Sequence, residues 1–145
     1  MATSEKPEMT RETMGEVRTE ALLVNATDES LVRRGQLARE QVRSYKADAL
    51  VDTGAVRSIV PTHVVQQLGL AIVENQVAEY ADGRQDVVGV TEAIEISING
   101  RRTLDEALVL GDEVIIGQTV LEKLDLLLTA EIAGSFRIPR TRTSL

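Results

Sequence analysis

One aspartate in this 145-residue chain stands where a carboxylate could do chemistry. Asp52 follows the apolar run Ala49-Leu50-Val51 and precedes Thr53-Gly54-Ala55. The apolar run predicts a buried strand that ends at Asp52, which would hold the carboxylate at the tip of a rigid element. Acid–base chemistry at a lone carboxylate normally needs a second acid. No second Asp-Thr-Gly or Asp-Ser-Gly occurs in the chain, so the partner must come from elsewhere.

The other titratable residues nearby do not supply that partner. Asp48 lies four residues before Asp52 on the same predicted strand face, and strand rise puts such residues roughly 13 Å apart, too far to share a proton. We therefore expect a solvated Asp48. His63 is the only histidine, and we expect it on the exposed side of a short helix. The plain alternative for Asp52 itself is an aspartate whose side chain only caps a turn.

Composition excludes several functions. The formal net charge of −7 disfavours nucleic-acid binding, which requires a basic surface. The chain has three aromatic residues, so it lacks stacking platforms for single strands or sugars. With no cysteine and one histidine, the sequence predicts no disulfide, no metal site and no cofactor. No apolar leader or membrane-length run is present, so we expect a cytoplasmic protein that does not contact a membrane.

The first half of the chain predicts strands after a polar arm. We expect residues 1–14 to form a flexible arm. The pattern favours a strand at 17–24, a turn at 25–30 and a second short strand at 31–33. Alternation in 42–51 predicts a strand that enters the core at Ala49.

The second half predicts hairpins and two short helices. Residues 58–70 are typical of a helix, with Pro61 at its first position and Gly69 at its C-terminal cap. Asp82-Gly83 predicts the tip of a long hairpin, and Asn99-Gly100 the turn of a second hairpin over 93–110. After a strand at 114–116, a helix follows that buries Val120, Leu121 and Leu124, and a last hairpin turns at 133–134. The tail at 140–145 is polar. The sequence therefore predicts a mostly β chain with two short helices.

This order of elements resembles the retropepsin-like aspartic proteases. Three segments carry the resemblance: "ALVDTGAVRSIV", the hairpin with Asp82-Gly83, and "VIIGQTVLEKLDLL". The second stands where that family has its flap, and the third looks like its apolar-apolar-Gly element behind the catalytic loop. A hairpin after the last helix makes the likeness nearest to small bacterial members. The resemblance implies a closed β-barrel of the acid-protease type, spanning residues 15–139.

The resemblance also answers the question of the second acid. In this family a homodimer brings two copies of one aspartate together across a two-fold axis. Asp52 would then be catalytic and would pair with Asp52 of the partner subunit. Two carboxylates about 3 Å apart share one proton and titrate as a unit. One can activate a water while the other protonates the peptide carbonyl, which gives an aspartic endopeptidase acting on an extended peptide.

The family pattern assigns roles to the neighbouring residues. The residues implied to support the catalytic loop are Thr53, Gly54 and Ala55. Those implied to contact substrate or to form the flap are Val56, Arg57, Tyr80, Ala81, Asp82 and Gly83. Those implied to lie behind the loop are Ile115, Ile116 and Gly117. Ala55 has no hydroxyl that could donate a hydrogen bond to the pair of catalytic aspartates, so the pair should be less acidic. We therefore expect activity at mildly acidic to near-neutral pH. The sequence departs from the pattern of the viral relatives in two places. The flap tip is charged here, whereas it is Gly-rich in viral relatives. At positions 56 and 57, viral relatives often have acidic residues.

Two other functions fit the sequence. The first is a non-catalytic dimeric scaffold or peptide-binding module of the same fold, which the charged flap tip favours. The second is an unrelated β-barrel partner protein, such as the acidic member of a toxin-neutralising pair. Loss of turnover in an Asp52→Asn variant that still folds separates an enzyme from a scaffold. A monomer with Asp52 far from any cleft would favour the partner protein.

Overall fold

The computed structural model describes residues 16–128 and 136–137, and within them the chain is mostly β with three α-helices. The strands are β1 Val17–Asn25, β2 Ser44–Val51, β3 Ser58–Val60, β4 Ile72–Glu79, β5 Gln85–Thr91, β6 Ile94–Ile98, β7 Arg101–Asp105, β8 Ala107–Val109, β9 Ile115–Ile116, β10 Leu127–Leu128 and β11 Phe136–Arg137. The helices are α1 Ala26–Arg33, α2 Thr62–Leu68 and α3 Gln118–Leu124, with a 3-10 turn η1 at Arg39–Gln41. The predicted arm at 1–14 and tail at 140–145 lie outside the described residues.

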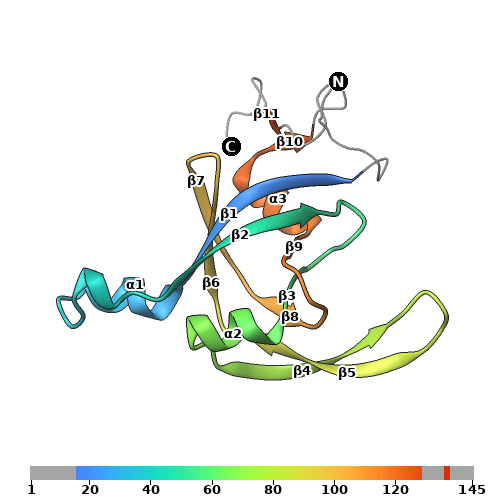
Figure 1. Cartoon of the computed structure of the whole chain (residues 1–145), viewed down its shortest axis with the longest axis horizontal. Helices are drawn as coiled ribbons and strands as arrows, with labels where there is room; N and C mark the ends of the chain where they lie inside the picture. Colours follow the sequence, from blue (N-terminus) through green and yellow to red (C-terminus); the bar gives the residue numbers. More distant parts are fainter. Residues whose placement is uncertain (1–15, 129–135, 138–145) are drawn as a thin grey trace.

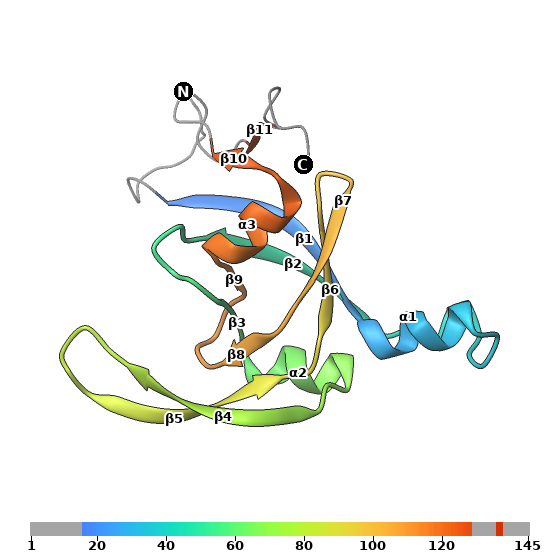
Figure 2. The same cartoon turned by 180° about the vertical axis from the view of Figure 1, so that it is seen from behind.

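Nine strands form one strongly curved sheet in the order β4-β5-β8-β3-β9-β2-β1-β6-β7. β10 and β11 form a separate antiparallel pair. Within the described residues the edge strands β4 and β7 are not paired with each other, so a closed barrel is not confirmed. The β4–β5 hairpin and α1 project from opposite sides of the molecule, as both views show (Figures 1 and 2).

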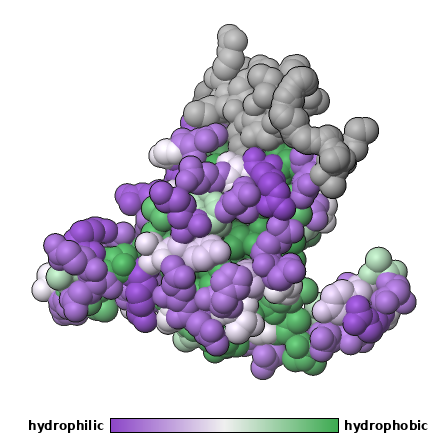
Figure 3. Space-filling model, in the orientation of Figure 1, coloured by the Kyte–Doolittle hydropathy of each residue, from purple (hydrophilic) through white to green (hydrophobic). Residues whose placement is uncertain are grey.

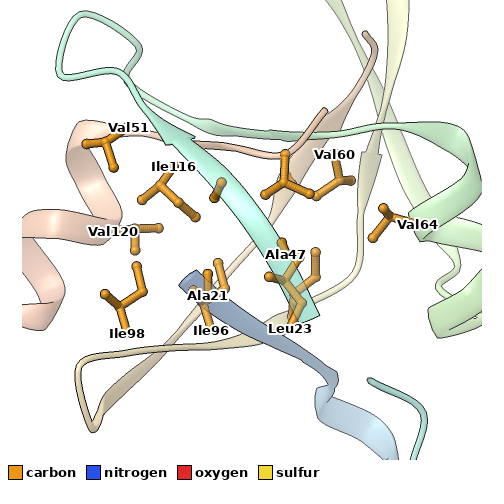
Figure 4. Close-up of a cluster of buried hydrophobic side chains, with 14 of the residues drawn as sticks. Ala21, Leu23, Ala47, Val51, Val60, Val64, Ile96, Ile98, Ile116 and Val120 are labelled. Atoms are coloured by element: carbon orange, nitrogen blue, oxygen red, sulfur yellow. The ribbon is translucent and has the colours of Figure 1, made fainter. Parts of the chain in front are cut away.

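The main core lies on one face of this sheet. The predicted strand enters the core as expected: Ala47, Ala49 and Val51 of β2 are buried while the residues between them are not. They pack with residues of β1, β3, β6 and β9 (Figure 4). Val64 and Leu68 of α2 and the three predicted apolar residues of α3 complete the cluster. Burial of aliphatic side chains on alternating positions is therefore what holds the Asp52 end of β2 in place.

The helix α1 corrects one prediction. The turn at 25–30 and the strand at 31–33 are wrong, because Ala26–Arg33 is helical. Asn25 is the N-cap and its side chain accepts a hydrogen bond from Asp28 N at 3.0 Å. Acidic residues stand in the first turn and Arg33 in the last, which favours a helix through its dipole. The helix α1, which the sequence analysis did not predict, follows from this capping signature. The signature outweighs the short apolar pattern that predicted a strand at 31–33.

Two further segments differ from the sequence prediction. The residues predicted to begin a helix at 58 instead form the strand β3, and α2 starts at Thr62 with Pro61 as its N-cap. The second hairpin ends at Asp105, after which β8 leaves it and pairs in parallel with β3. Both corrections have one cause, since β3 and β8 are three-residue strands that are defined by pairing with distant strands: with each other, and with β9 and β5 respectively.

The remaining elements agree with the prediction. β4 and β5 form the long hairpin around Asp82-Gly83, and β6 and β7 turn at Asn99-Gly100. Gly69 caps α2 with a φ of 62°, the left-handed conformation that glycine adopts without strain. The predicted turn of the last hairpin, at 133–134, lies outside the described residues.

A polar network around the buried residues Asn25 and Asp28 joins α1 to the sheet. Asp28 accepts hydrogen bonds from Arg43 N, Nε and Nη2 at 2.9–3.0 Å. Asn25 donates its side-chain amide to Leu68 O at 2.7 Å. The hydrogen bonds from Arg43 hold the pKa of the Asp28 carboxyl below its usual range, against the opposing effect of burial. These polar residues are therefore structural, and they connect the ends of β1, β2 and α2.

Candidate active site

Asp52 stands at the end of β2, on a loop of residues 52–57 that we call the Asp52 loop. Leu50 N donates to Val114 O and Asp52 N to Ile116 O, both at 3.0 Å, so the ladder with β9 continues through Asp52. Alternation along this ladder puts the side chains of Leu50 and Asp52 on the same face. The structure thus presents the carboxylate at the strand end, where the sequence predicted it.

The Asp52 loop turns tightly around its own carboxylate. Asp52 Oδ1 accepts a hydrogen bond from Gly54 N at 2.9 Å, and Ala55 N donates to Asp52 O at 3.1 Å. Asp52 is exposed, and within the described residues its Oδ2 makes no hydrogen bond. Thr53 is also exposed, with a hydroxyl that makes no hydrogen bond in the described part of the chain. One oxygen is therefore fixed by the turn and the other is available.

The start of α3 holds the loop from behind. Gly117 is buried, and a Cβ added to it would lie 2.8 Å from Ala55 O and from Arg57 C and O. Gln118 N donates to Ala55 O at 2.7 Å and Thr119 N to Val56 O at 3.3 Å. These N–H groups belong to the first turn of a helix, where they have no partner within the helix. The loop satisfies them, so the helix and the loop fix each other.

Ser58 completes this contact, and sequence reasoning missed it. Its buried hydroxyl accepts a hydrogen bond from Gly117 N at 3.1 Å. A serine that follows a loop carries no distinctive sequence signal. Only the approach of β9 and α3 to β3 gives its hydroxyl a function.

A row of apolar residues lies on the same sheet face as Asp52. Register pairs connect Leu50 of β2 to Ile115, Ile115 to Ile59, Ile59 to Leu108, and Leu108 to Val90. We call these five residues the apolar row. Val90 is fully buried and the other four are half-buried, and none of the five belongs to the main core. The row is therefore an apolar floor that runs from the Asp52 loop to the β4–β5 hairpin.

Arg57 and Glu106 stand beside this floor. Ser58 and Ala107 are register partners whose side chains face the main core. The residues just before them, Arg57 and Glu106, therefore face the side of the apolar row. Arg57 Nη2 lies 3.3 Å from Glu106 Oε1 in an ion pair that is partly open to solvent.

The β4–β5 hairpin has a tightly hydrogen-bonded tip. Tyr80 N donates to Arg84 O at 2.8 Å, Gly83 N to Tyr80 O at 2.9 Å and Arg84 N to Asp82 Oδ1 at 3.0 Å. The Arg84 guanidinium lies 4.3 Å from the centre of the half-buried Tyr80 ring. Ala81, Asp82 and Gly83 are exposed. Figure 3 shows a hollow between this hairpin and the body of the molecule.

The residues set aside from the sequence lie away from this arrangement. Asp48 is 79% exposed and pairs with Arg18 at 3.7 Å. His63 is exposed on α2 and contacts the edge of the Tyr45 ring. Among the described residues no group of acids and histidines could hold a metal ion. No helix in the described ranges is long and apolar enough to span a bilayer.

Comparison with known proteins agrees with this geometry. The model of a family described as "gag-polyprotein putative aspartyl protease" matches residues 38–123, which is more than half of the chain and includes the Asp52 loop and all of α3 except its last residue. No curated protein sequence matches the chain.

Among solved structures, the EIAV protease complexed with the inhibitor HBY-793 is 18% identical, with a TM-score of 0.52, and the match covers 83% of this chain and 99% of that one. The solution structure of Simian Foamy Virus (mac) protease is 17% identical, with a TM-score of 0.48, over 74% of this chain and 93% of that one. The first match shows the same fold. The likeness to bacterial members stays a prediction. An Asp-Thr-Gly loop locked by an apolar-apolar-Gly element, together with the family match and this fold, places the chain in the family of retropepsin-like aspartic proteases.

Proposed function

We propose that this chain is an aspartic endopeptidase that acts as a homodimer. The observation that carries the proposal is Asp52 itself: an exposed carboxylate on a locked loop, with Oδ1 held by Gly54 N and Oδ2 available. One chain offers a single Asp-Thr-Gly. The second acid is then Asp52 of the partner subunit, across a two-fold axis.

The chemistry follows from pairing two such groups. At a separation of about 3 Å the two carboxylates share one proton, because both cannot stay ionised. The ionised group takes a proton from a trapped water, and the protonated group donates to the carbonyl oxygen of the scissile bond. Water adds to the carbonyl carbon, and the amide nitrogen then leaves with a proton. The exposed Thr53 hydroxyl is suited to a hydrogen bond across the axis.

The apolar row and the hairpin support an extended peptide as the substrate. Leu50 is two residues from Asp52 on the same face, and such residues are roughly 7 Å apart. A peptide side chain next to the scissile bond would then rest on apolar side chains. The β4–β5 hairpin, with Tyr80 near its tip, closes over the peptide and excludes water. We expect an optimum at mildly acidic to near-neutral pH, because Ala55 donates no hydroxyl to the dyad.

A peptide-cleavage assay tests the proposal. A diverse peptide pool is incubated with the full chain across pH, with and without a statine-type transition-state mimic, and the oligomeric state is measured on the same sample. We expect cleavage by the dimer, inhibition by the mimic, and loss of turnover in Asp52→Asn with the fold intact.

A dimeric scaffold that binds peptides without cleaving them is the second candidate. The charged tip of the β4–β5 hairpin favours the scaffold. Its charges are those of Asp82 and Arg84, which form an ion pair, and the Arg84 guanidinium stacks on the Tyr80 ring. A scaffold binds the same peptides equally well with Asp52 or Asn at that position and releases no fragments.

A further inference from the structure

We infer that Arg57 makes this site selective for peptides with an acidic side chain close to the scissile bond. The inference rests on the proposed function and adds the substrate class. It concerns a residue whose charge is opposite to that of the acids on the β4–β5 hairpin, which include Glu79, Asp82 and Asp86.

The position of Arg57 follows from strand register. It precedes β3, two residues before Ile59 of the apolar row, and Ser58 between them is buried on the core side. Its guanidinium is therefore on the floor side of the sheet, at the end of the loop that carries Asp52. A substrate residue that leaves the apolar floor beside the Asp52 loop meets this guanidinium.

The existing partner of Arg57 leaves the cation available. The pair with Glu106 is a single contact of 3.3 Å, with side chains that are 29% and 48% exposed. Partly exposed pairs of this kind contribute little to stability. A guanidinium has five N–H donors, and in the described part of the chain this one uses one of them on a side chain. Room remains for a bidentate substrate carboxylate, which is the strongest partner of a guanidinium.

A carboxylate would gain more than Glu106 does. When the hairpin closes over a peptide, water leaves the site and the effective dielectric constant falls, so a charge pair there is stronger than one at the surface. A basic side chain would instead meet repulsion from Arg57, which its attraction to the partly exposed Glu106 would offset only in part. We therefore expect an acidic side chain to be preferred over a basic one at this position.

Dimer symmetry adds a second feature. In the proposed homodimer each subunit contributes one Arg57, so the two guanidiniums lie at equal distances on either side of the two-fold axis. We expect the acidic preference at one position before the scissile bond and at its mirror position after it.

Peptides that share one apolar core, with Glu, Gln or Lys placed at each position around the bond, test this selectivity. For the full chain we expect kcat/KM for Glu to exceed that for Gln by roughly tenfold at the two mirror positions. High salt should reduce this ratio. Arg57→Gln should bring the Glu-to-Gln ratio of kcat/KM to about one. Arg57→Glu should make the Lys peptide the better substrate and the Glu peptide the worse one. The matched control is Arg102→Gln, an arginine of β7 that is 70% exposed and paired with Glu95, which should keep the ratio.

Each outcome has one meaning. Equal rates for Glu and Gln, a preference for Lys, or a ratio that survives Arg57→Gln overturns the inference while peptide cleavage stands. If no peptide is cleaved by the dimer, the proposed function fails and the inference falls with it. Should Arg57→Gln not fold, Glu106→Gln serves instead, and it should raise the Glu-to-Gln ratio by freeing the guanidinium.

Discussion

Gly117 lies so close to Arg57 that a Cβ on the glycine would be 2.8 Å from the carbonyl carbon and oxygen of the arginine. The contact joins the start of α3 to the end of the Asp52 loop, two segments sixty residues apart in the chain. Because this approach needs a glycine, the position of Asp52 depends on a residue that takes no part in the chemistry.

Gly117→Ala tests that dependence. The added methyl group must push the Asp52 loop or α3 aside, and overpacking of this kind costs about 1–3 kcal/mol of unfolding free energy. We expect a lower urea midpoint and a much larger loss of kcat than of peptide affinity. Gly35→Ala is the matched control, since its Cβ would meet nothing within 4 Å. With its φ of 73° it should lose some stability and keep its activity. Full activity in Gly117→Ala would show that the loop is not held in this way.

Ser58→Ala tests the hydroxyl that accepts from Gly117 N. The substitution leaves a buried N–H without an acceptor, which costs about 1–3 kcal/mol. We expect a similar fall in stability by chemical denaturation, together with reduced kcat. Ser58→Thr restores the hydroxyl and should recover most of both. If alanine and threonine behave alike, the hydrogen bond has no role at this position.

The ion pair between buried Asp28 and half-exposed Arg43 predicts how stability depends on pH. The Arg43 hydrogen bonds lower the pKa of Asp28 in the folded state, whereas an unfolded aspartate has a pKa of about 3.9. The pair therefore stabilises the fold fully above about pH 4, and its contribution is lost as the pH falls through the lower folded value. Denaturation at a series of pH values should show this decline.

Asp28→Asn gives the matched comparison. It should cost about 1–3 kcal/mol at neutral pH and flatten the decline in acid. Asp48→Asn changes an aspartate that is 79% exposed, and should change the free energy of unfolding by less than about 0.5 kcal/mol. An acid profile for Asp28→Asn as steep as that of the parent chain would contradict this account of the pair.

Much of the frame around Asp52 could be predicted from local signals. Asp82-Gly83, Asn99-Gly100 and Gly69 each require a backbone conformation that few residue types adopt, so their turns and caps were predicted correctly. The Asp52 loop and Gly117 were recognised through their motifs, and the structure shows the contact between them. Whether these residues catalyse stays a prediction.

What the sequence did not reveal depends on pairing between distant segments. β3 and β8 are too short to show a period, and they form by pairing with each other and with β9 and β5. Ser58 gains its partner Gly117 from the approach of β9 to β3, and Glu106 gains Arg57 from the pairing of β3 with β8. The helix α1 is different, because Asn25 as a capping residue and the acidic first turn are local signals that are present in the sequence itself.

The central claim is that two copies of Asp52 form one active site, and subunit mixing tests it most directly. Wild-type chain is held at a fixed concentration at which it is fully dimeric, an equal amount of Asp52→Asn is added, and the subunits are allowed to exchange before peptide cleavage is measured. If each site needs Asp52 from both subunits, random pairing converts half of the wild-type chains into inactive heterodimers, and activity falls to about half. Activity that stays unchanged on mixing would mean that one chain cleaves alone, and would contradict the shared site.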